Sequence, residues 1–473
     1  MQYIYKTKIK GVLTKMHRQQ LQFLHEWLHD KNRKPLIIRG ARQVGKSTLV
    51  ELFAREYKKT LLNVNLERHP ELSQIFSDKD PAQIIQQIEF LPNMGNINKD
   101  ALLFLDEIQA IPEAIPALRY FYEDKPDLPV VSAGSLLEFV LSDHSFSMPV
   151  GRIQYLHMGP MTFTEFLAAV GEEKLKSFVM HYEPSQKIGE VVHKRLLSLM
   201  RSYYYIGGMP EAVAVFVDSH SYKDVSKVHN SIIETYREDF SKYAGSRNLL
   251  RMRNVFNFVA RNVGQKIKYS NISFQDQSVT IKKDLELLSM ARIIGKVTHS
   301  HCSGLPLQAD INEKVYKALF LDVGLMNALC GLDWNVVSQM DDVKLINEGA
   351  IAEQFIGQHL QSLLADTPNR ELTYWLREGR SSNAEIDFVI GIAGTIIPIE
   401  VKAGATGKLK SLHQFMGSKQ APLAIRFDAS LPSVSQINTM INIDREHRNV
   451  DYQLISLPLY LIERLEVIVE HFL

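Results

Sequence analysis

The sequence predicts an α/β protein with several domains, the first of them built on a doubly wound parallel sheet. Three observations lead to this fold class. The chain has 473 residues, enough for about two to four domains. Hydrophobic residues make up 45% and charged residues 23%, the balance of a folded protein. From Pro35 to about His157, short apolar runs alternate with helical patterns, as they do in βα units.

Charge and cysteine content exclude several classes of protein. The 54 Lys and Arg residues nearly balance 53 Asp and Glu residues, so the formal net charge is only +1 and any basic surface must be local. The two cysteines, Cys302 and Cys330, form neither a disulfide nor a metal-ligand pattern, which favours a reducing compartment. We find no signal peptide and no apolar segment long enough to span a bilayer, so the cytoplasm is the expected location.

The order of the expected elements divides the chain into five segments. After the α/β domain the chain reads mainly as helices, and from residue 343 onward it returns to an alternation of helices and strands. The segments are an N-terminal helical segment (1–34), the first α/β domain (35–160), a helical connector (161–243), a basic domain (244–330) and a second α/β domain (343–473).

Positive charge is concentrated between Lys242 and Lys296. This stretch holds eleven Lys or Arg residues but only three Asp or Glu residues. A helix over 251–263, a second helix over about 277–288 and a strand over 292–298 follow one another in the order of a winged helix. Its partner would be DNA. The alternative is an ordinary connector with solvated basic side chains.

The strongest motif is an uninterrupted G-x-x-x-x-G-K-[ST] that begins at Gly40. It follows an apolar strand and precedes a helix, the context in which this loop binds nucleotide phosphates through its backbone N–H groups. Lys46 would reach the β- and γ-phosphates, and the Ser47 hydroxyl would be a Mg²⁺ ligand. The expected ATP-binding residues are Gly40, Ala41, Arg42, Gln43, Val44, Gly45, Lys46, Ser47 and Thr48.

An apolar strand over 101–105 ends in Asp106 and Glu107. Two carboxylates at the end of a buried strand are typical of the second half of such a site. We expect Asp106 to hold Mg²⁺ through water and Glu107 to act as the general base on the attacking water.

Three further residues are candidates for sensing the γ-phosphate or stabilising its charge. The next apolar strand ends near Ser132 and Ser135, and either hydroxyl, Ser135 first, could lie beside that phosphate. Arg152 could stabilise the charge of the transition state, in its own subunit or across the interface of a homo-oligomer. A surface salt bridge is the alternative role for Arg152.

These motifs resemble the bacterial and archaeal AAA-plus ATPases that carry a C-terminal domain of unknown function. The resemblance rests on GARQVGKSTL, LLFLDEIQ, SAGS, MGPMTFTEF and YIGGMPEAV, and it continues through YREDF and VYKALFLDVGL. It implies a P-loop ATPase of AAA-plus type, a winged helix and a C-terminal nuclease-like fold. Ala133 departs from the family, which more often has Thr before Gly-Ser.

A second group of charged residues lies in the last domain. Glu353 falls in the centre of the apolar stripe of a helix over 345–364, where a carboxylate needs a cation or a metal as partner. Asp387 follows on one strand, and Glu400 and Lys402 share one face of the next strand. This set resembles the PD-(D/E)xK core of restriction-endonuclease-like domains. The resemblance implies Mg²⁺ on Asp387 and Glu400, with catalytic support from Lys402 and Glu353. The alternative is a salt-bridged remnant without catalysis.

Together, these features predict an ATP-hydrolysing switch that acts on DNA through the winged helix and the nuclease-like domain. The competing hypothesis is a slow regulatory ATPase whose C-terminal domain only binds a protein partner or DNA. The four residues Glu353, Asp387, Glu400 and Lys402 discriminate between the two. An accessible, convergent set favours a nuclease, and a buried or blocked set favours the switch.

Overall fold

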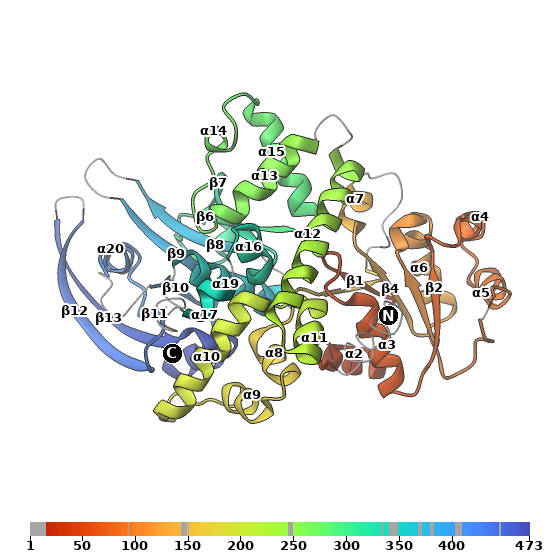
Figure 1. The fold of residues 1–473 in the computed structure, drawn as a ribbon, viewed down its shortest axis with the longest axis horizontal. Coiled ribbons are helices and arrows are strands. Elements are labelled where there is room, and N and C mark those ends of the chain that lie inside the picture. Colours follow the sequence, from red (N-terminus) through yellow and green to blue (C-terminus); the bar gives the residue numbers. More distant parts are fainter. Residues whose placement is uncertain are drawn as a thin grey trace. The chain divides into compact units, whose positions relative to one another are not determined.

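The fold was obtained as a computed structural model (Figure 1). It describes residues 16–92, 94–142, 149, 151–244, 249–332, 334–339, 349–367, 371–378, 383–402, 409–443 and 446–473. Most of the expected N-terminal segment, residues 1–15, lies outside the described residues, as does residue 343, where the second α/β domain was expected to begin. The chain forms two compact units: Met1–Met161 with Met290–Ile293, and Thr162–Ser289 with Ile294–Leu473.

The first unit contains the expected parallel sheet. Its five strands lie in the order β2-β3-β4-β1-β5, and every neighbouring pair is parallel. The strands are β1 (Leu36–Arg39), β2 (Thr60–Asn65), β3 (Ala101–Asp106), β4 (Val130–Gly134) and β5 (Gln154–His157). The helices are α2 (Gln20–His29), α3 (Lys46–Glu56), α4 (Ser73–Asp78), α5 (Pro81–Glu89), α6 (Ala114–Asp124) and α7 (Leu137–Ser142).

Helices cover both faces of this sheet, which is why β3 reads as a continuous apolar run. Leu103 and Leu105 are fully buried in one cluster with residues of α4, α5 and α6. Leu102 and Phe104 alternate with them, are also fully buried, and belong to the opposite face, since successive strand residues point to opposite sides. Helix α3 packs against β2, β3 and β4.

The second unit begins with helices, as expected for residues 161–243. They are α8 (Phe163–Ala169), α9 (Glu173–Met180), α10 (Glu190–Ile206), α11 (Pro210–Ser219) and α12 (Tyr222–Ala244). Further helices are α13 (Leu249–Arg261), α14 (Tyr269–Ile272), α15 (Ser278–Met290), α16 (Val323–Leu329), α17 (Trp334–Gln339), α19 (Gly349–Leu363), α20 (Lys410–Lys419) and α21 (Leu465–Phe472), and η6 (Leu459–Arg464) is a 3-10 helix.

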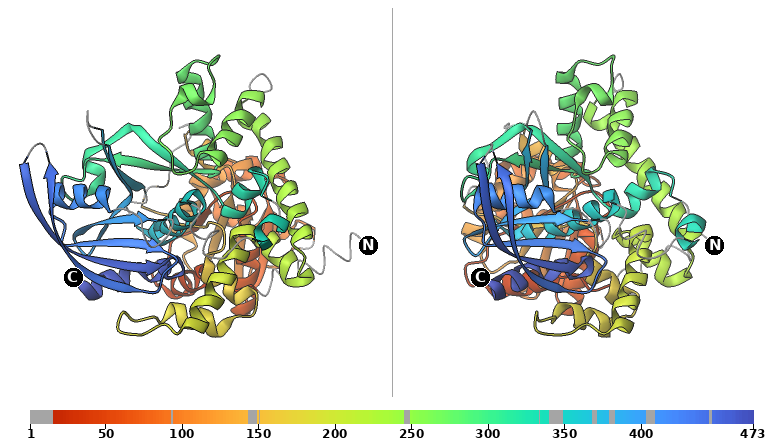
Figure 2. Two further views of the ribbon diagram at one scale, coloured as in Figure 1. Left: turned by 60° about the vertical axis from the view of Figure 1, so that its left-hand side comes forward. Right: turned by 90° about the vertical axis from the view of Figure 1, so that its left-hand side faces the viewer.

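An eight-stranded mixed sheet forms the rest of this unit, in the order β12-β13-β11-β10-β9-β8-β6-β7. Its strands are β6 (Ile294–Ser300), β7 (Ile311–Phe320), β8 (Leu372–Arg377), β9 (Ala384–Ile392), β10 (Thr395–Val401), β11 (Leu423–Asp428), β12 (Ser433–Ile443) and β13 (Glu446–Pro458). The two last strands form a long antiparallel hairpin, drawn in dark blue in Figure 2.

The hairpin of β6 and β7 follows α15, where a wing was expected as part of a separate basic domain ending at residue 330. Strand β6 also pairs in parallel with β8, so the hairpin extends the C-terminal sheet by two strands. The segments 161–243, 244–330 and 343–473 therefore belong to one compact unit, because backbone hydrogen bonds of a single sheet cross the expected boundary.

A buried carboxylate fixes the turn at Gly207 and Gly208. Asp322 is fully buried and accepts hydrogen bonds from the N–H groups of Gly208 (2.7 Å) and Leu325 (3.0 Å), the second of which caps α16. Burial raises the pKa of Asp322 to about 6, against the lowering effect of these bonds. The carboxylate thus joins the end of α10 to the beginning of α16.

We predict that Asp322→Ala destabilises the second unit by roughly 3 kcal/mol, because it leaves two buried N–H groups without an acceptor. Asp224→Ala, at an exposed helical ion pair with Lys227, is the matched control and should leave the unfolding midpoint almost unchanged. Urea unfolding of both variants measures the difference, and equal midpoints would refute the structural role of Asp322.

Candidate functional site

The expected phosphate-binding loop connects β1 to α3 in the first unit. Gly45 has φ 94°, a left-handed conformation that favours glycine, and it immediately precedes Lys46, the first residue of α3. Ala41 and Val44 are buried, so they offer the loop only their backbone groups. The N-terminus of α3 therefore faces the loop with its free N–H groups, the arrangement that binds phosphate.

The Lys46 side chain lies against this loop. Its ammonium group donates to the carbonyl oxygens of Gly40 (2.9 Å) and Ala41 (2.7 Å), and the residue is only 8% exposed. Burial lowers the pKa of Lys46 to about 8, and the nearby carboxylates of Glu107 and Asp106 oppose this shift. The group is thus a positive charge held at the loop with two bonds that a phosphate could replace.

Ser47 and Asp106 are neighbours, although they are far apart in sequence. The Ser47 hydroxyl donates to both Asp106 oxygens, at 3.2 and 3.0 Å. Burial raises the pKa of Asp106, while its bond from Ser47 lowers it. A hydroxyl and a carboxylate side by side are oxygen ligands of the kind that Mg²⁺ takes, so these residues fit the ion.

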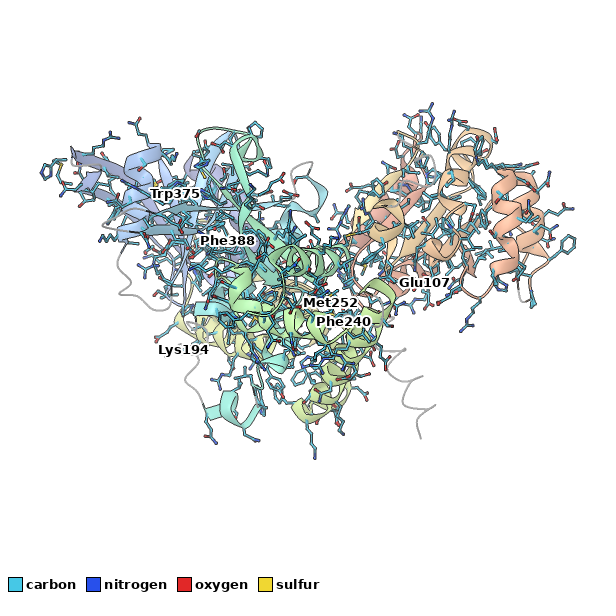
Figure 3. The ribbon with its side chains drawn as sticks, turned by 90° about the horizontal axis from the view of Figure 1, so that it is seen from above. Glu107, Lys194, Phe240, Met252, Trp375 and Phe388 are labelled. Carbon is cyan, nitrogen blue, oxygen red and sulfur yellow. The ribbon has the colours of Figure 1, made fainter. Side chains whose placement is uncertain are left out.

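Glu107 follows Asp106 in a left-handed conformation, with φ 54°. One of its carboxylate oxygens accepts from Gln109 Nε2 (2.5 Å) and from the Ser135 hydroxyl (3.4 Å), and Arg42 Nε donates to that hydroxyl (3.2 Å). Glu107 is labelled in Figure 3. Arg42 and Ser135 are thus linked to Glu107. Ser132 instead donates to the Leu36 carbonyl inside the sheet.

Gln109 is a site residue that the sequence reasoning missed. It lies two positions after Glu107 within LLFLDEIQ, a stretch already assigned to the site. Its amide could have been noticed there as a group able to orient the glutamate. The side-chain oxygen of Gln109, Oε1, also lies close to Gly134, where an added Cβ would be 2.3 Å from this oxygen.

The structure does not bring Arg152 to this site. Arg152 precedes β5, and β5 begins beside Leu36, at the amino edge of the sheet, whereas the loop leaves from the carboxyl edge. Arg152 Nε is 3.1 Å from Glu123, and its guanidinium stacks over Tyr122. Within one subunit, this residue therefore forms a surface salt bridge and cannot contact the nucleotide.

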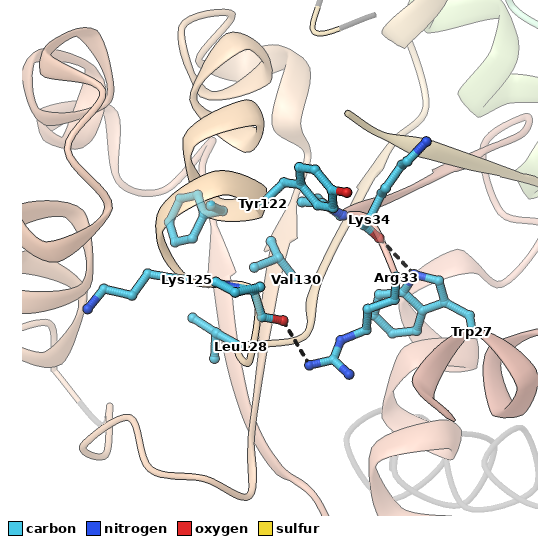
Figure 4. A pocket seen from close by; sticks show the side chains of 10 residues that line it. Trp27, Arg33, Lys34, Tyr122, Lys125, Leu128 and Val130 are labelled. Atoms are coloured by element: carbon cyan, nitrogen blue, oxygen red, sulfur yellow. Dashed lines mark hydrogen bonds between the residues drawn. The ribbon is translucent and has the colours of Figure 1, made fainter. Parts of the chain in front are cut away.

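A small pocket at this amino edge does not change that conclusion (Figure 4). Trp27, Arg33 and Tyr122 are among its lining residues, and Trp27 Nε1 donates to the Lys34 carbonyl at 2.8 Å. Its volume of about 10 Å³ is the space of a single water molecule. It cannot hold a nucleotide.

The second group of predicted residues does converge, on one face of the large sheet. Glu353 comes from α19, Asp387 from β9, and Glu400 from β10, which Lys402 follows. The Asp387 carboxylate accepts the Val401 N–H at 2.7 Å, and Glu400 forms an ion pair with Lys402. The helix and the two strands thus deliver all four side chains to one place.

Lys317 of β7 is the residue that the sequence reasoning missed here. Its ammonium group is 3.0 Å from Glu353 and 3.8 Å from Asp387, and it pairs with Glu385 as well. Burial alone would lower the pKa of Lys317, but these carboxylates raise it. The sequence did carry a signal, because Lys317 is a single charge inside the apolar run VYKALFL.

The expectation that Glu353 needs a cation is confirmed, and Lys317 is that cation. Burial raises the pKa of both Glu353 and Glu400 to about 8, against the attraction of the nearby lysines. In the described part of the chain, no three His, Cys, Asp or Glu side chains are arranged to hold a metal ion. The set is therefore convergent. Glu400 is buried, whereas Glu353, Asp387 and Lys402 keep 14%, 17% and 27% of their side chains exposed, and Lys317 pairs with two of the carboxylates.

Family comparisons agree with the first of these sites. Residues 32–167 match an AAA domain, residues 197–336 match a domain of unknown function (DUF8612), and residues 348–445 match another (DUF4143). The comparison with curated proteins gave no match.

Among described residues, no helix is long and apolar enough to cross a membrane.

Several solved structures are similar to this chain. The Walker-type ATPase PABY2304 of Pyrococcus abyssi is 16% identical, with a TM-score of 0.41, over 67% of this chain and 96% of its own. The ORC1 protein of Aeropyrum pernix, solved in complex with DNA, is 14% identical, with a TM-score of 0.26, over 70% and 98%. Thermotoga maritima RuvB is 13% identical, with a TM-score of 0.29, over 63% and 93%.

The family matches confirm the resemblance that the sequence motifs implied. The five-stranded parallel sheet, the loop after β1 and the carboxylates after β3 all lie within the matched residues 32–167. The chain therefore combines an AAA ATPase domain with the domains of unknown function DUF8612 and DUF4143.

Proposed function

We propose that this protein is an ATP-hydrolysing switch. The observation that carries the proposal is the arrangement of Lys46, Ser47, Asp106 and Glu107 around one loop. Lys46 donates to the loop, Ser47 donates to Asp106, and both carboxylates interact electrostatically with Lys46. Lys46 and the loop N–H groups would hold the phosphates, and Glu107, positioned by Gln109, would take a proton from the attacking water. Mg²⁺ held by Ser47 and, through water, by Asp106 would neutralise phosphate charge.

The link between the two units supports a switch rather than a simple hydrolase. Strand β5 pairs with β1, which leads into the loop, and only residues 158–162 separate β5 from α8. The first N–H groups of α8 are bound within the second unit, by His359 (2.9 Å from Phe163 N) and Glu463 (2.9 Å from Thr164 N). A conformational change at the phosphate-binding loop can therefore be transmitted through β1 and β5 to α8.

Arg152 keeps one proposed role, across the interface of a homo-oligomer. Its position at the amino edge leaves it accessible to another subunit, as its exposed fraction of 45% indicates.

We predict that Lys46→Ala loses ATP binding, whereas Glu107→Gln retains binding and loses at least about 100-fold in hydrolysis. The reason is that Lys46 contacts ground-state phosphate charge and Glu107 acts only on the water. Calorimetry with ATP and a phosphate-release assay measure the two effects. Glu190→Gln, at an exposed ion pair with Lys194 in the second unit, is the control and should hydrolyse ATP normally. Unchanged hydrolysis in Glu107→Gln would refute its role as base.

For the basic segment we propose a winged helix that binds DNA. Helices α13, α14 and α15 precede the β6–β7 hairpin in the order of this fold. Lys282 and Lys283 are exposed on α15, whereas Arg251 is held inside by the buried Asp284 (2.6 Å). Phe274 and Val279 near the beginning of α15 are 93% and 66% exposed, which suits contact with bases.

We predict that duplex DNA binding weakens steeply with salt and that replacing Lys282 and Lys283 by Gln lowers the slope by about two counterions. Replacing Lys194 and Lys223, exposed lysines elsewhere in the same unit, should leave the slope unchanged. Fluorescence anisotropy between low and moderate salt measures both. No binding even at low salt would favour a protein partner over DNA.

The C-terminal domain we propose to be restriction-endonuclease-like in fold but not a nuclease. The order α19, β8, β9, β10, α20 and β11 supports the fold. Glu400, with only 3% of its side chain exposed, and Lys317, which pairs with the other carboxylates, support the non-cleaving alternative. The domain would then bind the partner that the ATPase controls.

A further inference from the structure

The carboxylate cluster of the second unit consists of Glu353, Glu385, Asp387 and Glu400. Lys317 reaches this cluster from an unexpected strand. In the sheet, β6 and β8 lie between β7, which carries Lys317, and β9, which carries Glu385 and Asp387. The ammonium nitrogen lies over the ring of Tyr374 on β8, 5.1 Å from the ring centroid, where it meets the carboxylates of β9. Lys317 is thus directed into the cluster and away from solvent.

A charge in this position needs strong compensation. The Lys317 side chain is 1% exposed, so its ammonium group has lost its water. An ammonium group has three N–H donors, and the cluster supplies three carboxylates to it, those of Glu353, Glu385 and Asp387. Such an arrangement is stable only because each charge has its partner in place.

The spacing of the cluster fits an ammonium ion rather than a metal ion. The nitrogen lies 3.0 and 3.8 Å from oxygens of Glu353 and Asp387, whereas Mg²⁺ requires about 2.0–2.1 Å to every ligand. Consistent with this spacing, no group of three potential metal ligands exists among the residues that the structure describes. The carboxylates are therefore held apart at the distance that a lysine needs.

One carboxylate oxygen of the cluster remains unused. Glu400 is 2% exposed, and one of its oxygens pairs with Lys402. The other, Oε2, has no hydrogen-bond partner among the residues that the structure describes. The Glu400 carboxylate interacts electrostatically with Asp387 and Lys317. A buried acceptor without a partner, such as this oxygen, favours a nearby cation. In this cluster Lys317 already supplies the positive charge.

The backbone closes the cluster on another side. Gly264, with φ 74°, approaches Glu353 so closely that an added Cβ would lie 2.2 Å from its Oε2. The positive φ and this close approach both favour glycine at this position.

We propose that Lys317 is the resident cation of the carboxylate cluster and holds the place that a divalent metal ion would otherwise take. The domain is then free of metal while β7 is paired in the sheet. Removing the Lys317 side chain turns the same carboxylates into a divalent-cation site.

The test uses the full-length, nucleotide-free protein and Mn²⁺ as the probe. The number of Mn²⁺ ions bound per chain is counted by electron paramagnetic resonance in wild type, Asp387→Asn, Lys317→Ala and the Lys317→Ala/Asp387→Asn double variant. Any Mn²⁺ at the loop of the first unit is common to all four chains and cancels.

We predict equal counts in wild type and Asp387→Asn, about one additional ion in Lys317→Ala, and loss of that ion in the double variant. A higher count in wild type than in Asp387→Asn would overturn the proposal, because it would place metal beside Lys317. No additional ion in a folded Lys317→Ala variant would overturn it equally.

Lys317→Ala leaves buried carboxylates without a cation, so its folding is followed by thermal melting. Mn²⁺ or methylammonium should raise the melting temperature of Lys317→Ala by several degrees and leave that of Lys317→Arg, which keeps the charge, unchanged. A Lys317→Ala chain that stays unfolded with both cations would contradict the proposal. ATP hydrolysis tests the proposed switch separately, since it depends on residues of the first unit only.

Discussion

Helix α19 imposes the constraint on which the second unit depends, because it buries polar side chains that must all find partners. Glu353 forms an ion pair with Lys317 of β7, and Gln354 exchanges two hydrogen bonds with the backbone of Phe320. Gln358 accepts a hydrogen bond from the Val323 N–H and donates one to the Tyr203 hydroxyl. His359 accepts a hydrogen bond from the Phe163 N–H. Leaving one such group unpaired costs about 1–3 kcal/mol, and more for a charge. The large sheet, α16, α10 and α8 are therefore fixed relative to one helix.

Much of this architecture could be predicted from local sequence patterns. The loop after β1 and the carboxylates after β3 were assigned because each motif is contiguous. In the C-terminal half, α19 covers the described part of the helix expected over 345–364, and helices and strands alternate after it as expected, since apolar periodicity marks them clearly. Strands β12 and β13 were missed because β12 is an edge strand rich in Ser, Asn and Gln, whose exposed face carries little apolar signal.

The misses at the functional sites have a different physical origin. Glu353 was expected to need a cation, but nothing in its neighbourhood identifies Lys317, which is 36 residues away on another element. Arg152 is a different case. It comes just before β5, and in a parallel sheet such a residue lies at the amino edge, opposite the loop, so the expected parallel sheet already argued against its contact with a nucleotide in the same subunit. The periodicity of apolar residues along the sequence predicts helices and strands, but it does not show which side chains of distant elements form contacts.

The sharing of one sheet by two family domains affects how such proteins can be cut and recombined. The DUF8612 match ends at residue 336 and the DUF4143 match begins at 348, yet β6 on one side of this boundary is hydrogen-bonded to β8 on the other, and β7 pairs with β6. A fragment cloned from residue 343 onward would lack Lys317 and expose the edge of β8. Gene fusions that exchanged either domain alone would break a sheet, so the two segments must be inherited and expressed together.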